Sequence, residues 1–211
     1  LTKTTADEMA NQARELHALG PENAVIKVAI GGYRALDPSA DPYTGLKVIR
    51  RLWERDIRVN ATLVFNTTQA FWAANAGAEY ISPFLGRLAD YMYKNDIPER
   101  PDGNSLYDVI DHKDSKGDQH VFNTEYVAQG GRRKDAGVRL IREIAAVFAN
   151  YDIHAEILAA SIRNAAQISE VLVAGADILT VPAKILGTVA DHPLSNEGMV
   201  SFDDDAKVFS T

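Results

Sequence analysis

The chain has 211 residues and a mass of 23.1 kDa, and 46% of its residues are apolar, enough to fill the core of one domain. Its net charge of −7, without a basic stripe, opposes binding to a nucleic acid through phosphate contacts. The absence of cysteine excludes disulfides, thiolate metal sites and a cysteine nucleophile, and no apolar run approaches the roughly 20 residues of a membrane span. We expect a soluble, cytoplasmic protein with neither a membrane nor a nucleic acid as its partner.

Segments of two kinds alternate along the first part of the chain. Apolar residues at helical spacing predict an amphipathic helix over 4–19, which ends at Gly20-Pro21. A nearly continuous apolar run at 25–30, interrupted by Lys27, predicts a strand buried on both faces. The next predicted elements are a loop at 31–42, a helix at 45–55, a strand at 59–65, a helix at 69–77 and a strand at 78–84.

From 88 to 130 the pattern gives way to a polar stretch that is too long for an ordinary connection, and a lid or a disordered excursion would account for it. Helical spacing of apolar residues returns at 135–149. The last predicted elements are a strand at 154–162, a helix at 165–174, a strand at 177–181 and a helix at 183–190.

Five apolar strands that alternate with helices predict an α/β fold with a parallel sheet. Gly31-Gly32 is too weak a match to the glycine-rich turn of a nucleotide-binding open sheet, so an α/β barrel is favoured. In such a barrel the catalytic groups project from the carboxyl ends of the strands. Polar residues within or just after the apolar runs are therefore the candidates.

Lys27 lies inside the first strand, where a charged ammonium is costly to bury unless it is paired or loses its proton. Desolvation would lower the pKa of this amine, and a neutral amine is a nucleophile. A lysine that leaves the strand end to pair with a carboxylate is the competing interpretation.

Asn60 and Thr62 fall on one face of the second strand because side chains alternate with a period of two. Next to a reactive lysine, these two groups could orient a substrate hydroxyl or a water molecule. A polar rim of the sheet is the alternative.

The ends of the third and fourth strands carry the same pair of residue types. Ser82 and Arg87 bracket the third strand end, and Ser161 and Arg163 bracket the fourth. Planar guanidinium groups with neutral hydroxyl donors are suited to a phosphate monoester. Either arginine alone would be interpreted as a surface ion pair, whereas the repetition favours a phosphate site.

The segments VIKVA (25–29), NATLVF (60–65), ISPFLGR (81–87) and LAASIRN (158–164) resemble, in the same order, motifs of the transaldolase/fructose-6-phosphate aldolase family. The segments DAGV (135–138) and DILTVP (177–182) fit the same pattern. The resemblance covers nearly the whole chain apart from two inserted stretches.

This resemblance implies a (β/α)8 barrel and a Schiff base between Lys27 and a ketose phosphate, with neither cofactor nor metal. An iminium is an electron sink that stabilises the carbanion left when a carbon–carbon bond breaks. The other implied roles are substrate binding by Asn60, Ser82 and Phe84, positioning of the catalytic water by Thr62, and phosphate binding by Arg87, Ser161 and Arg163.

Phe84 bears on the subclass, because free aldolases of this family tend to carry tyrosine there and transaldolases phenylalanine. The expected function is transfer of a dihydroxyacetone unit from a ketose phosphate to an aldose acceptor. The reaction would belong to the pentose phosphate pathway or serve an unusual sugar, and the expected enzyme is a homo-oligomer. An aldolase that releases free dihydroxyacetone and a non-catalytic sugar-phosphate binder are the alternatives, although a binder has no use for Lys27.

The chain also departs from the family pattern. Family members have three further strands before the lysine strand, with residues for proton transfer, so this chain accounts for five of eight strands. We expect a single barrel domain over 1–211 from which the first three strands are absent, because the given sequence lacks them; a second chain that completes the barrel is the alternative. Insertions at about 31–43 and 88–130 are expected near the active-site mouth, where they could reshape acceptor specificity.

Three other groups of residues have the chemistry of a site but not its context. Lys184 opens a helix and is expected to be solvated rather than nucleophilic. His112, His120 and Glu125 have the residue types of a metal site but lack its tight spacing. The run 203–205 of three aspartates is expected to be solvated.

Overall fold

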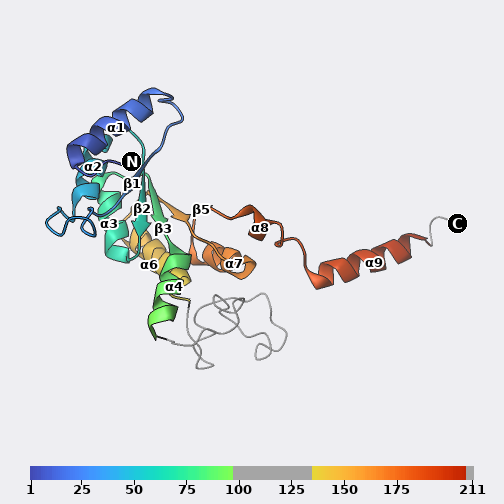
Figure 1. Ribbon diagram of the computed structural model, residues 1–211. Helices are drawn as coiled ribbons and strands as arrows, with labels where there is room; N and C mark the ends of the chain where they lie inside the picture. Colours follow the sequence, from blue (N-terminus) through green and yellow to red (C-terminus); the bar gives the residue numbers. More distant parts are fainter. Residues whose placement is uncertain (97–134, 208–211) are drawn as a thin grey trace.

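The computed structural model describes residues 1–96 and 135–207 (Figure 1). Five parallel strands pair in chain order and form one sheet, as expected for an α/β protein with consecutive β–α units. The strands are β1 (Ile26–Ala29), β2 (Val59–Val64), β3 (Tyr80–Pro83), β4 (Glu156–Ala159) and β5 (Ile178–Leu179). This sheet is consistent with a (β/α)8 barrel, because barrel strands also follow one another in chain order.

Helices connect these strands, and most of them lie close to the sheet (Figure 1). The described helices are α1 (Ala6–Ala18), α2 (Thr44–Trp53), α3 (Thr67–Ala76), α4 (Leu85–Asp96), α6 (Ala136–Asn150), α7 (Ala165–Ala174), α8 (Ala183–Leu186) and α9 (Pro193–Lys207).

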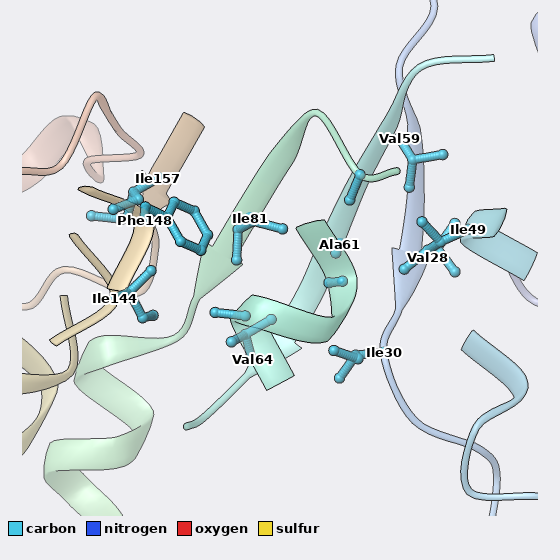
Figure 2. Packing of buried hydrophobic residues seen from close by; sticks show 14 of the residues in the cluster. Val28, Ile30, Ile49, Val59, Ala61, Val64, Ile81, Ile144, Phe148 and Ile157 are labelled. Carbon is cyan, nitrogen blue, oxygen red and sulfur yellow. The ribbon is translucent and has the colours of Figure 1, made fainter. Parts of the chain in front are cut away.

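The hydrophobic core covers one face of the sheet. The register places Val28 beside Ala61 and Ala61 beside Ile81, so their side chains share a face. Figure 2 shows this row of buried side chains, which extends to Ile157 on β4 and packs against helix residues such as Ile49 of α2. The expectation that the strands are buried on both faces is wrong for β1, in which buried and more exposed residues alternate. Ile26 and Val28 of β1 are buried in the core on the helix-covered face, whereas Lys27 on the opposite face is exposed.

Two connections after strands use the same local device. Asn66 caps α3 and accepts a hydrogen bond from the backbone N–H of Gln69 at 2.8 Å, and Asn164 caps α7 by the same bond from Gln167 at 2.8 Å. An asparagine oxygen satisfies a backbone N–H that the first helical turn leaves without a partner. Both helices therefore start directly behind the carboxyl ends of their strands.

The structure corrects two predictions of secondary structure. Residues 88–96 belong to α4, not to an irregular stretch, because this helix packs along α6. Helix α9 was not predicted, and it lies apart from the sheet with none of its residues buried (Figure 1). The helix predicted over 183–190 ends at Leu186.

Other predictions are confirmed or fall outside the described residues. The stretch from 31 to 43 is a loop, and the aspartates at 203–205 are exposed. Most of the expected second insertion, with His112, His120 and Glu125, lies outside the described residues. Within residues 1–96 and 135–207 no helix is both long and apolar enough to cross a membrane.

Candidate active site

The polar residues singled out in the sequence share the sheet face opposite the core. Pairing of β1 with β2 places Lys27 beside Asn60, and pairing of β2 with β3 places Thr62 beside Ser82. This confirms that Asn60 and Thr62 lie on one face, as the two-residue period of a strand requires. The three strands thus gather four of the candidate residues into one patch.

Asn60 and Ser82 are joined by a direct hydrogen bond. The hydroxyl Oγ of Ser82, which is fully buried, donates to Oδ1 of Asn60 at 2.8 Å. This bond fixes which end of the Asn60 amide faces Ser82 and leaves the amide nitrogen as the end that can donate to another oxygen.

Thr62 holds a buried hydroxyl for which the described part of the chain offers no partner. Thr62 is 7% exposed, and its Oγ1 makes no hydrogen bond to the described residues. The next residue, Leu63, has a φ of 59°, and the register between β2 and β3 shifts between Thr62 and Val64. Such a bulge re-aims side chains next to functional sites. An unpaired hydroxyl on this face is suited to hold a water molecule or a substrate oxygen.

Lys27 reaches along the sheet toward the carboxyl end of β3. Its Nζ lies 5.6 Å from the centre of the Phe84 ring, within the range of a cation–π contact. The side chain is exposed, so the expectation of a buried lysine is wrong for the described structure. Ile26 and Val28 take the buried positions of β1, and the alternation of the strand directs Lys27 away from them.

Phe84 is the centre of a small group at the end of β3. The guanidinium carbon of Arg87 lies 5.2 Å from its ring centre, and the Phe65 ring packs edge-on at 6.2 Å. Sequence reasoning gave Phe65 no role, although its place at the end of β2, next to the strand that carries Phe84, was a usable signal. The aromatic pair forms an apolar wall beside two cations.

Arg87 and Arg163 lie at neighbouring strand ends, as expected. Arg87 is in the first turn of α4, and Arg163 follows β4, which pairs with β3. Gly86 lies against the turn at Ser161, because a Cβ there would come within 2.0 Å of the Ser161 carbonyl oxygen. Ser161 itself has a φ of 70°, a left-handed conformation that is uncommon for serine.

Both arginines have exposed side chains and described contacts with neighbouring residues. Arg163 is exposed and makes a long ion pair with Asp90 of α4, at 3.4 Å. A contact of this length between exposed groups is weak. Arg87 is also exposed. Two guanidinium groups at one edge are suited to bind a dianionic phosphate.

Two buried carboxylates behind this edge were missed as functional candidates by sequence reasoning. Asp135 is 7% exposed and Glu170 is 1% exposed. Burial raises the pKa of Asp135, against hydrogen bonds from Gln167, Val138 and Gly137 that lower it. Burial, and secondarily the Asp135 carboxylate, raises the pKa of Glu170 to about 8. The motif DAGV marked Asp135, but nothing local in the sequence connected it to Glu170.

The described side chains include no group of three or more histidine, aspartate or glutamate residues that could hold a metal. Lys184 is exposed at the start of α8, in agreement with the expectation that it is solvated. The candidate residues themselves supply an amine, hydroxyls, an amide and guanidinium groups.

Comparisons with known proteins agree with these motifs. The family model described as transaldolase/fructose-6-phosphate aldolase matches residues 1–211. A probable transaldolase of Thermoplasma volcanium is 34% identical over 210 residues, which are 100% of this chain and 70% of that protein. A probable transaldolase of Caulobacter vibrioides is 32% identical over 199 residues, 94% of this chain and 67% of that protein.

The chain thus spans about two thirds of the length of the curated relatives that it matches. Among solved structures, a mandelate oxidase variant is similar with a TM-score of 0.45 at 16% identity, over 83% of this chain and 44% of that one. A flavocytochrome b2 variant is similar with a TM-score of 0.48 at 14% identity, over 84% of this chain and 40% of that one.

Proposed function

The chain belongs to the transaldolase/fructose-6-phosphate aldolase family, and from this premise we propose that it transfers a dihydroxyacetone unit from a ketose phosphate to an aldose acceptor through a Schiff base on Lys27. The observation that carries this proposal is the gathering of Lys27, Asn60, Thr62 and Ser82 on one face of the sheet, with Phe84 5.6 Å from the lysine nitrogen.

The proposed reaction begins when the neutral amine of Lys27 adds to the ketose carbonyl, and the adduct takes up a proton from solvent and loses a water molecule. The resulting protonated imine withdraws electrons from the adjacent carbon. The C4 hydroxyl then gives its proton to the water that Thr62 would hold, the electron pair of the C3–C4 bond moves into the iminium, an aldose leaves and an enamine remains on Lys27. The enamine attacks the aldehyde of the acceptor, and hydrolysis returns the free lysine.

The remaining side chains of the face have roles that follow from their hydrogen-bonding capacity. The Asn60 amide, held by Ser82 at 2.8 Å, would donate to a hydroxyl of the dihydroxyacetone unit. The unpartnered Thr62 hydroxyl would hold the water that adds to and leaves from the imine. A positioned water is an efficient proton carrier because the proton moves within one hydrogen bond.

The donor phosphate would bind at the edge formed by Arg87, Ser161 and Arg163. Guanidinium groups offer several N–H donors in a plane, and phosphate oxygens accept them in pairs. Arg87, Ser161 and Arg163 follow the carboxyl ends of β3 and β4. With the phosphate bound to them, the sugar would extend across the sheet face toward Lys27 on β1.

The transfer reaction is favoured over release of free dihydroxyacetone because Phe84 offers no hydroxyl near the lysine. An apolar ring does not position a proton for the enamine, so the enamine survives until an acceptor arrives. The loop at 31–43 follows β1 and would contact the acceptor. Its sequence would therefore decide whether the acceptor is an aldose of the pentose phosphate pathway or an unusual sugar. We propose that the protein is cytoplasmic and that it is a homo-oligomer. Exposed apolar side chains on α9, such as Met199 and Phe202, support the homo-oligomer.

The test is chemical trapping of the imine. Fructose 6-phosphate and borohydride are added to the purified protein, and the modified peptide is identified by mass spectrometry. We expect a stable three-carbon adduct on Lys27 and loss of activity, with no adduct in the Lys27→Arg variant. An adduct on another lysine would reject the proposed mechanism.

A further inference from the structure

The turn that carries Arg163 is held from behind by a buried glutamine. Gln167 of α7 is fully buried, and its Oε1 accepts the backbone N–H of Arg163 at 2.9 Å. Its Nε2 donates to Oδ2 of Asp135 at 2.8 Å. The amide can satisfy both neighbours in this one orientation only, because one neighbour is a donor and the other an acceptor.

Asp135 divides its two oxygens between α6 and α7. Oδ1 accepts the backbone N–H groups of Gly137 at 2.8 Å and Val138 at 3.0 Å and so caps α6. Oδ2 accepts from Gln167. A continuous chain of hydrogen bonds therefore runs from the first turn of α6 to the backbone of Arg163.

The start of α6 also touches the start of α4, which carries Arg87. A Cβ on Gly137 would come within 2.2 Å of the Leu85 carbonyl oxygen, and one on Gly86 within 2.0 Å of the Ser161 carbonyl oxygen. The first turn of α4 therefore packs closely against both the first turn of α6 and the turn after β4, and these three segments form one junction. Both arginines of the proposed phosphate site project from this junction.

The connection after β2 provides an internal comparison. Gln69 stands in the same position relative to Asn66 as Gln167 does to Asn164, and its Oε1 accepts the backbone N–H of Phe65 at 2.8 Å. Gln69 is only half-buried, whereas Gln167 is fully buried and bonded to a buried carboxylate. The extra anchor is thus found at the strand end where the phosphate is proposed to bind.

We propose that Asp135 and Gln167 are positioning residues for the donor phosphate, which hold Arg163 in register with Arg87. This inference rests on the proposed function, because it assigns these residues to the phosphate end of that site. They act through the backbone of the turn and do not touch the substrate.

The polarity of the hydrogen-bond chain supplies the variants. Asp135→Asn keeps a capping oxygen for α6 but places an N–H group against the N–H group of Gln167. Rotation of the Gln167 amide would relieve that clash only by presenting its nitrogen to the N–H of Arg163. Adding Gln167→Glu supplies two acceptor oxygens and restores both bonds. The pair of changes also keeps one carboxylate in the cluster.

Three quantities are measured on the purified protein: KM for fructose 6-phosphate, kcat, and the inhibition constant of inorganic phosphate. We expect D135N to raise both KM and the inhibition constant about tenfold at little cost in kcat, because small misplacements of a binding group are costly. The double variant D135N/Q167E should return both constants to within about threefold of wild type. Trapping with dihydroxyacetone and borohydride, which involves no phosphate, should keep its wild-type concentration dependence in every variant.

Gln69→Met is the matched control, because it removes the equivalent glutamine from the other connection. Loss of the Gln69 amide should lower the free energy of unfolding without raising the inhibition constant of phosphate. Gln167→Met replaces D135N if the latter does not fold, since it removes both bonds and keeps the side-chain volume.

The outcomes separate the two proposals. A wild-type protein without transfer activity or imine trapping would overturn the proposed function. An active wild type, with a folded D135N variant that binds phosphate as wild type does, would overturn the positioning role alone. A double variant as impaired as D135N would also overturn it, because the restored bonds would then not matter.

Discussion

The amine nitrogen of Lys27 lies 5.6 Å from the centre of the Phe84 ring, although Lys27 is in β1 and Phe84 directly follows β3, which is not a neighbour of β1 in the sheet. β2 lies between them and contributes Asn60 and Thr62 to the same face. The lysine therefore crosses over its neighbouring strand to reach the aromatic ring. This geometry makes the nucleophile and the ring testable as a unit.

Lys27→Met is expected to abolish turnover and leave the fold intact. The side chain is exposed and packs into no core, so the free energy of unfolding should change by less than about 0.5 kcal/mol. Neither methionine nor the guanidinium of Lys27→Arg can form an imine at neutral pH. Steady-state kinetics and urea unfolding of both variants check this, and turnover by Lys27→Arg at the wild-type rate would contradict it.

Phe84→Tyr is expected to shift the reaction from transfer toward release. A phenol hydroxyl near the lysine could position a water or deliver a proton to the enamine, which ends the transfer cycle. The measurement is the ratio of free dihydroxyacetone to transferred product with a saturating acceptor. Phe65→Tyr, at the ring that packs against Phe84, serves as the control for a hydroxyl placed one residue further away. An unchanged ratio in Phe84→Tyr would remove this residue as the determinant of subclass.

Alanine at Arg87 or at Arg163 is expected to raise KM for a phosphorylated donor by about one to two orders of magnitude, for the loss of one charge-assisted hydrogen bond of about 1.5–3 kcal/mol. Unphosphorylated dihydroxyacetone should be little affected. Arg139→Ala is a control, since Arg139 is an exposed arginine of α6 that pairs with Glu143 at 3.4 Å. Equal losses with both kinds of substrate would count against a phosphate role.

Thr62→Val is expected to separate function from stability. The buried hydroxyl has no partner in the described residues, and removing such a group relieves a desolvation cost of about 1–3 kcal/mol. The variant should be as stable as wild type or more so, yet kcat should fall about a hundredfold if the hydroxyl holds the catalytic water. Thermal unfolding and kcat are measured together. A stable variant with wild-type kcat would exclude that role.

Glu170 is expected to make stability depend on pH. Its pKa is raised by burial to about 8 in the folded protein, above the ordinary value of 4.5, so the folded state keeps a proton that the unfolded state loses. Its contribution to stability is therefore full below about pH 4.5 and is lost as pH rises toward 8. At about 1.4 kcal/mol per pH unit between 4.5 and 7, the free energy of unfolding falls by at most about 3.5 kcal/mol by pH 7.

The check compares Glu170→Leu with wild type by urea unfolding at pH 5 and at pH 7.5. The variant should gain on wild type as pH rises, because leucine has no proton to hold and fills a similar volume. Glu143→Gln, at an exposed glutamate of α6, should show no such trend. A difference between Glu170→Leu and wild type that stays constant with pH would contradict the raised pKa.

Local periodicity was sufficient to predict much of the fold and the candidate site. Asn60 and Thr62 share a face because strand side chains alternate, and this rule needs no knowledge of neighbouring strands. The glycine-ended helix α7 was predicted with its observed bounds, since Asn164 and Gly175 are capping signals at either end. The same reasoning missed residues 88–96, where packing of α4 along α6 outweighs a mixed local pattern.

The sequence by itself determined the succession of the five strands, the residue types at the strand ends and the family to which the chain belongs, whereas helices α4 and α9 were missed. Only the tertiary structure decided that Lys27 is exposed, that Ser82 donates to Asn60, and that Asp135 reaches Arg163 through Gln167. Propensity and periodicity act over a few neighbouring residues, whereas Asp135 and Gln167 meet across 32 positions of sequence. Such a contact forms only when two helices pack at one edge of the sheet, and its energy depends on burial that no local pattern specifies.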